Sequence, residues 1–137
     1  MKHIIVAIFS ILILQSDNVT KTNLTVKIEG FEKEESSEVV VAIFKEKNFL
    51  ETPISFQYVK INNDKVIANF ELEPGEYAVS TFQDLNGNRK LDKKFYGPPK
   101  EPYGFSNNVR PFGKPSFKKC KFNLTSDSKT ITIALIN

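Results

Sequence analysis

The stretch VIANFELEPGEYAVSTF, residues 66–82, decides the fold class of this 137-residue chain. In its first half an apolar side chain stands at every second position: Val66, Ala68, Phe70 and Leu72. This period of two is typical of a strand with one buried face. The pair Pro74-Gly75 predicts a reversal of the chain, and residues 77–82 predict the next strand.

The same strand signals recur along most of the chain. Five further segments predict strands, at residues 24–30, 39–44, 56–59, 120–124 and 131–135. Residues 39–44 are apolar on both faces, as a central strand would be. Seven short strands without an amphipathic helix predict an all-β fold, a single antiparallel β-sandwich of immunoglobulin-like or transthyretin-like type. A small closed barrel is the alternative architecture.

Composition limits the chemistry available to this chain. Its 19 basic and 16 acidic side chains give a formal net charge of +3, which is too small to indicate nucleic-acid binding. The single histidine, His3, lies in a predicted leader, so histidine-dependent catalysis and histidine metal sites are excluded for a mature chain. The single cysteine, Cys120, has no intramolecular disulfide partner. It falls in a strand-like alternation, which predicts a buried, inert thiol.

The first residues predict export. A basic start is followed by the apolar run IIVAIFSILIL at residues 4–14. This run fits a secretory signal peptide over residues 1–16 and is too short for a stable membrane span. The expected mature chain is one domain, residues 17–137, in the periplasm or outside the cell. The alternative for the apolar run is a buried first strand.

Residues 83–116 lack clear strand alternation, and we call them the signature loop. They hold four of the six glycines, five of the seven prolines and several aromatic residues. Long irregular loops inside compact domains are uncommon and usually functional. This composition predicts an ordered loop that packs on its own side chains at one end of the sandwich.

The first half of the signature loop predicts a possible calcium site. Oxygen-bearing side chains follow the spacing of a calcium-binding loop at Asp84, Asn86, Asn88 and Asp92, with the Lys90 carbonyl between them and Glu101 as a further oxygen source. Ca²⁺ takes about 6–8 oxygen ligands, and alternate residues of a curled loop can direct oxygens to one centre. Two carboxylates with two amides predict weak binding, with Kd about 10⁻⁴–10⁻³ M.

Two departures keep a second interpretation open. Arg89 stands where the sharp-turn glycine of such loops belongs, and Phe95 stands where the bidentate glutamate belongs. The alternative is an Asx-rich turn in which the Asp and Asn side chains cap their own backbone, with Gly87 at positive φ.

The second half of the loop predicts a possible binding surface. Aromatic residues alternate with Gly and Pro, and the candidate contact residues are Tyr96, Tyr103, Phe105 and Asn107. Rigid aromatic platforms suit sugar rings or peptides, although aromatics can equally form the small core of the loop. A third hypothesis is a glycosidase-like pair of carboxylates, Asp84 or Asp92 with Glu101.

Four pieces of the chain carry a family resemblance. They are Pro74-Gly75-Glu-Tyr77-Ala78, Asp84-x-Asn86-x-Asn88-x-x-Leu91-Asp92, Gly97-x-Pro99-x-Glu101-x-Tyr103-Gly104-Phe105-Ser106-Asn107 and Gly113-x-Pro115-Ser116-Phe117. Together they closely resemble the bacterial domain of unknown function 2141 family over residues 24–136. The resemblance implies a small, exported, β-rich bacterial protein with no established activity. Members commonly carry His where this chain has Gln83, and Gly is more usual at the position of Pro102.

These observations favour a non-catalytic binding or scaffolding module of the bacterial envelope, without catalytic residues. Its partner would be a glycan, a peptide or an envelope protein, and Ca²⁺ is the possible cofactor. The alternatives are a small carbohydrate-active or other hydrolytic enzyme that uses loop carboxylates, and a purely structural envelope protein.

Overall fold

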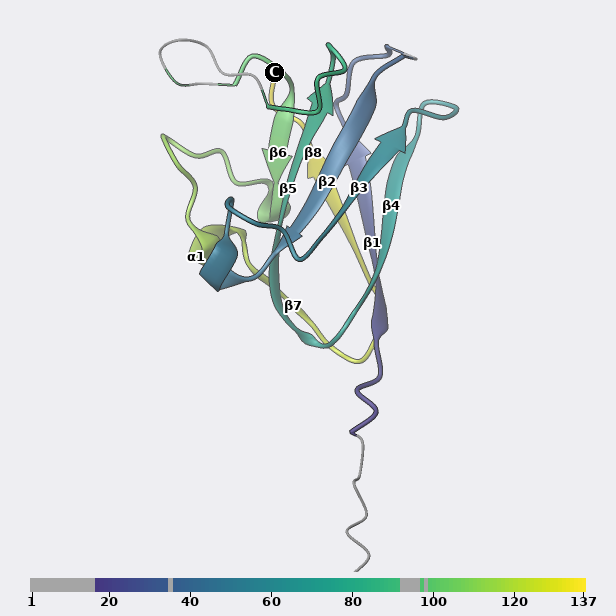
Figure 1. Ribbon diagram of the computed structural model, residues 1–137, viewed down its shortest axis with the longest axis vertical. Coiled ribbons are helices and arrows are strands. Elements are labelled where there is room, and N and C mark those ends of the chain that lie inside the picture. Colours follow the sequence, from purple (N-terminus) through teal and green to yellow (C-terminus); the bar gives the residue numbers. More distant parts are fainter. Residues whose placement is uncertain (1–16, 35, 92–96, 98) are drawn as a thin grey trace, which may run out of the picture.

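The protein is a sandwich of two β-sheets (Figure 1). The computed structural model describes residues 17–34, 36–91, 97 and 99–137. One sheet has three strands in the order β4 (Val66–Leu72), β1 (Thr22–Glu29) and β8 (Lys129–Ala134). The other has the order β3 (Ser55–Lys60), β2 (Glu38–Phe44), β5 (Gly75–Asp84) and β6 (Tyr103–Phe105), and its fifth strand, β7 (Phe122–Leu124), pairs with β5. The predicted all-β sandwich is therefore confirmed.

Strand pairing is antiparallel with one exception among the described strands. In the three-stranded sheet Val26 of β1 lies opposite Ala68 of the antiparallel β4 and opposite Ile131 of the parallel β8. In the five-stranded sheet β2 lies between β3 and β5, antiparallel to both. β2 is thus a central strand, as its continuous apolar sequence predicts.

The main core fills the space between the two sheets. It is built from side chains of both sheets, and its fully buried members include Leu24, Val26, Val39, Val41, Ile43, Val79 and Ile133. At every second position of β1 and β4 a buried side chain alternates with a more exposed one, which is the period-two pattern of the sequence. The segment that decided the fold class therefore supplies part of the core.

The chain reversal at Pro74-Gly75 changes sheets. β4 pairs with β1, whereas β5 pairs with β2, so the two strands joined by this reversal lie in different sheets. The two layers are consequently connected covalently at this end of the sandwich. In Figure 1 β5 runs from this turn, at the bottom, to the opposite end, where Asp84 closes the strand.

Two details of the predicted strand set are corrected. Cys120 does not lie in a strand: it ends the short helix α1 (Phe117–Cys120), and β7 begins two residues later. The Ser116 side chain accepts a hydrogen bond from the Lys119 N–H and so starts this helical turn. The second correction is β6, a three-residue strand inside the signature loop that the sequence pattern did not predict.

β6 fits beside β5 and next to the end of the chain. The Tyr103 N–H and C=O pair with Ile136, and a Cβ added to Gly104 would lie 2.8 Å from Ile133 Cγ2. Only glycine allows this close approach. The predicted signal peptide, residues 1–16, lies outside the described residues. No helix among the residues that the structure describes is long and apolar enough to span a membrane.

Candidate functional site

The five-stranded sheet has a second apolar face, which points away from the three-stranded sheet and which we call the outer face. The strand registers place Tyr58, Val40, Phe82 and Tyr103 in one row across the sheet, and Phe56, Ala42, Ser80 and Phe105 in the next. A face that pointed into solvent would be expected to carry polar side chains. This face is instead apolar at seven of these eight positions if tyrosine is counted as apolar.

Part of the outer face is covered by the signature loop. A small second core forms there from Ala78, Phe105, Phe117 and Cys120, with Phe49 and Val109 among the side chains packed against it. The 3-10 turn η2 (Ser106–Asn108) and helix α1 hold this cluster against β5. Phe105 of the loop is thus buried, but in a cluster shared with β5 and α1 rather than in a core made by the loop alone.

Beyond this cluster a groove of about 980 Å³ lies between the sheet and the loop. The sheet contributes its floor through Val40, Ala42, Phe44, Ser80, Phe82, Tyr103 and Phe105. One wall residue, Leu50, comes from the segment between β2 and β3. The other described wall residues come from the signature loop: Leu91, Gly97, Pro99, Pro111, Phe112, Gly113, Lys114 and Pro115. Phe112 is fully exposed at this site. The volume lies at the upper end of the range for small-molecule pockets.

The four predicted contact residues divide between the groove and its surroundings. Tyr103 and Phe105 line the groove, and their rings meet edge to face with centroids 6.0 Å apart. Asn107 does not line it, because its amide donates hydrogen bonds to the Lys119 and Lys121 carbonyls. Tyr96 lies outside the described residues.

Asp84 is the most buried of the predicted calcium ligands that the structure describes, with 1% of its surface exposed. Its Oδ2 accepts a hydrogen bond of 2.7 Å from the Arg89 N–H, five residues along the chain. Its Oδ1 is buried without a hydrogen-bond partner among the described residues. Arg89 adopts φ +57°, the left-handed conformation that a calcium-binding loop needs at this position. The departure from glycine therefore does not change the backbone conformation of the loop.

The two asparagines of the loop form Asx turns. Asn86 Oδ1 accepts the Asn88 N–H, and Asn88 Oδ1 accepts the Lys90 N–H. Gly87 has φ +73°. The alternative prediction of an Asx-rich turn is thereby confirmed as a description of the backbone. Asp92 lies outside the described residues.

Glu101 joins the two limbs of the signature loop. Its side chain is buried, and its Oε2 accepts a hydrogen bond of 2.7 Å from the Leu85 N–H, next to Asp84. No three His, Cys, Asp or Glu side chains gather as a metal site within the described part of the chain. A cation at Asp84 would therefore need amide and carbonyl oxygens as well as carboxylates.

The Arg89 side chain lies where the Asp84 loop meets the outer face. The Arg89 guanidinium lies 4.0 Å from the centre of the Tyr58 ring and 3.4 Å from Glu38 Oε2. The loop is thus fastened to β3 and β2 at the same time, through a cation–π contact and an ion pair. Leu91, two residues further on, lines the groove, so the conformation of this loop sets one wall of the groove.

Two buried polar residues with structural roles were missed by the sequence analysis. Gln83 is fully buried: its Nε2 donates to the Glu32 carbonyl and the Ser37 hydroxyl, while its Oε1 accepts the Glu32 N–H. The Ser106 hydroxyl accepts the Val79 N–H and donates to the Cys120 carbonyl. Ser106 is part of the family motif, and Gln83 stands where family members commonly carry His. At least part of the motif therefore consists of residues with a structural role.

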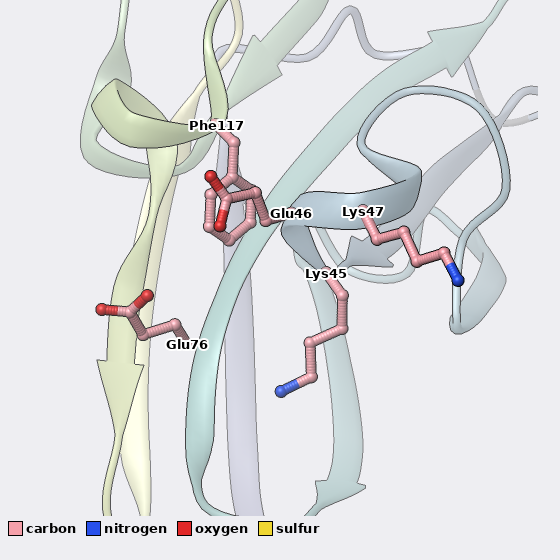
Figure 2. Close-up of a pocket in the computed structure, with 5 residues that line it drawn as sticks. All are labelled: Lys45, Glu46, Lys47, Glu76 and Phe117. Atoms are coloured by element: carbon pink, nitrogen blue, oxygen red, sulfur yellow. The ribbon is translucent and has the colours of Figure 1, made fainter.

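A second pocket, of about 610 Å³, is small and of mixed charge. Figure 2 shows the side chains that line it, Lys45, Glu46, Lys47, Glu76 and Phe117. Lys47 points away from the other four. Lys45 lies over the Tyr77 ring at 4.0 Å, and Glu76 pairs with Lys121 at 3.0 Å. Because two of the four charged side chains in this pocket already have protein partners and its lining offers a single apolar side chain, the groove is the stronger candidate site.

Comparison with known proteins identifies the family. Residues 26–132 match a bacterial family described as an uncharacterized protein conserved in bacteria, DUF2141. The chain therefore belongs to this family of small bacterial proteins, as its motifs indicated. No curated protein and no solved structure matches the sequence.

Proposed function

We propose that this protein is an exported, non-catalytic binding module that holds its ligand in the groove on the outer face. The observation that carries the proposal is an apolar sheet face left half covered, with a groove of about 980 Å³ between the sheet and the loop. Apolar surface exposed to water is costly, and concave apolar sites with few polar groups are typical of ligand binding. Export is proposed from the leader-like residues 1–16.

The absence of catalytic groups from the described lining supports a non-catalytic role. Its polar side chains are Ser80, Tyr103 and Lys114, with no carboxylate, thiol or imidazole among the described residues. Two of the three carboxylates of the enzyme hypothesis, Asp84 and Glu101, each accept a backbone N–H at 2.7 Å, and the third, Asp92, lies outside the described residues. These bonds give both carboxylates a role in shaping the loop.

We further propose that Ca²⁺ orders the rim of the groove at Asp84. A buried carboxylate oxygen without a partner is costly in an apolar interior, and a cation would satisfy Oδ1. The residues that would hold the ion are Asp84, Asn86, Asn88, the Lys90 carbonyl and Asp92, with Glu101 beside them. Bound Ca²⁺ would compensate the charge of Asp84 and would fix the position of Leu91 at the groove wall. It would take no part in a reaction.

A thermal melt with and without Ca²⁺ tests the metal proposal. At a free concentration about tenfold above Kd, binding raises the free energy of unfolding by about 1.4 kcal/mol and Tm by about 5 °C. Asp84→Asn keeps an acceptor for the Arg89 N–H but removes the charge, so its Tm is expected not to respond. Asp127→Asn lies in the exposed turn after β7, which pairs with the start of β5, at the opposite end of that strand from Asp84. It is the matched control and keeps the response. An equal rise with Mg²⁺, or none at millimolar Ca²⁺, contradicts the proposal.

A neutral apolar dye tests the groove. N-phenyl-1-naphthylamine is expected to bind the folded protein at one saturable site with increased fluorescence. Ser80→Phe places a large ring on the groove floor and should abolish this signal. Ile67→Phe, on the exposed face of β4, is the matched control and should leave it unchanged. Equal binding by both variants would show that the dye does not enter the groove.

A further inference from the structure

We infer that the ligand of the groove is a single-chain fatty acid, its acyl chain lying on the outer face and its carboxylate paired with Lys114. This inference rests on the proposed binding function and goes beyond it by naming the ligand class. Three observations support it: the apolar character of the groove, the pairing state of its backbone, and the charge at its wall.

The chemistry of the groove suits a chain without polar atoms. Its floor offers aromatic and aliphatic side chains from β2, β5 and β6, with the Ser80 hydroxyl between Ala42 and Phe105 in the same row. Burying an acyl chain against such a surface yields about 0.8 kcal/mol for each CH₂ group removed from water. The fully exposed Phe112 ring gives the chain a further apolar surface at the wall.

Peptides and glycans fit this groove less well because they are polar along their whole length. The backbone groups of β2 and β5 are already paired with neighbouring strands, so the floor presents side chains rather than free N–H and C=O groups. A peptide lying there would leave its own backbone groups without partners, which is costly. A sugar would likewise find two hydroxyls, those of Ser80 and Tyr103, and one ammonium group among the described lining.

Charge selects the headgroup. Lys114 is the one residue with a charged side chain among the described lining residues. A single ammonium balances a single carboxylate, whereas a phosphate monoester carries about −1.5 to −2 charges at pH 7. Lys114 lies in the segment Pro111–Pro115 with Phe112, so one wall segment offers both an apolar and a cationic contact. This pairing is the pattern expected for an amphipathic anion.

Displacement of N-phenyl-1-naphthylamine by twelve-carbon chains tests the inference. Dodecanoate is expected to displace the dye at concentrations at least about tenfold lower than dodecyltrimethylammonium, since one charge-assisted contact is worth about 1.4 kcal/mol or more. Lys114→Glu should weaken displacement by dodecanoate about tenfold or more, measured relative to the dye affinity of the same variant. Lys118→Glu, the same change on the exposed side of α1, should alter neither.

Each outcome decides one proposal. If the dye binds and no twelve-carbon chain displaces it, the fatty-acid inference is wrong while the groove remains a binding site. Equal displacement by the anionic and cationic chains also overturns the inference, as does tighter binding of dodecyl phosphate than of dodecanoate. If the dye itself does not bind the wild-type protein, the proposed function fails first.

Discussion

The two faces of the five-stranded sheet are made of similar residues but are covered by different kinds of structure. The inner face, with Val39, Val41 and Ile43 of β2, is sealed by the three-stranded sheet and fully buried. The outer face, with Val40 and Ala42 of the same strand, is covered by an irregular loop that leaves a groove. Apolar side chains alone therefore do not distinguish a core from a binding site, and the regularity of the covering element does.

The covering loop is fixed to the sheet mainly by hydrogen bonds, whereas the main core is stabilised by packing of apolar side chains. Ser106 and Asn107 tie the loop to backbone groups of β5 and to the carbonyls around α1, and Asn108 does the same at β8. Side-chain to backbone hydrogen bonds fix a loop at discrete points and leave the space between them open. A second sheet would have filled that space with interdigitating side chains.

The largest predicted effect concerns truncation on the inner face. Ile43→Ala is expected to lower the free energy of unfolding by about 2–5 kcal/mol, because it leaves a cavity in a sealed core. Phe56→Ala, on the outer face at 52% exposure, should cost about 1 kcal/mol because roughly half of the ring is already in water. Urea unfolding of both variants checks the difference. Equal losses would mean that the outer face is packed as a core.

A smaller effect is expected where the loop is fastened to the outer face. Ser106→Ala removes a buried hydroxyl and leaves the Val79 N–H and the Cys120 carbonyl without that partner. The expected loss is about 1–3 kcal/mol in the free energy of unfolding. Hydrogen exchange should show faster exchange at Val79. Ser126→Ala, in the exposed turn before β8, is the control and should stay within about 0.5 kcal/mol of the wild type.

The sequence predicted the regular layers well and the loop poorly, for a physical reason. Strands such as β1 and β4 can be recognised from the sequence because burial on one face imposes an apolar residue at every second position. β6 has three residues, Tyr-Gly-Phe, which are too few for a period, and its place depends on Gly104 fitting against Ile133. The continuous apolar run of β2 correctly indicated a strand buried on both faces but not the kind of element that covers the second one.

The candidate site was predictable in its residue types and not in its assembly. Tyr103 and Phe105, two of the predicted contact residues, line the groove. The Asn107 side chain does not, because it donates hydrogen bonds to the Lys119 and Lys121 carbonyls. Phe82 and Ser80 were missed as site residues because β5 alone does not reveal which of its faces is left open. That information comes from the path of the described loop residues, 84–91 and 99–116, across the sheet, which no local pattern encodes.

The smallest predicted effect is a pH dependence of the free energy of unfolding that differs between the two faces. Burial raises the pKa of the Cys120 thiol in the outer cluster, whereas burial and then the Glu73 carboxylate raise the pKa of Tyr77 in the inner core. A raised pKa means that the folded state holds its proton more tightly than the unfolded chain. The resulting stability is complete below the unfolded pKa, about 8.5 for Cys and about 10 for Tyr, and is lost as pH rises through the folded pKa.

Stability should therefore fall in two steps on the alkaline side, first through Cys120 and then through Tyr77. Cys120→Ala is expected to remove the first step and to keep the second. Because the Tyr77 step begins only at about pH 10, urea midpoints between about pH 7 and 12 measure both. In the native state at about pH 8 the thiol should react with alkylating agents far more slowly than in urea, because the thiolate is the reactive form. Rapid native alkylation would mean that the loop opens over the outer face, and the contrast between a sealed and a loosely covered face would then extend to Cys120 itself.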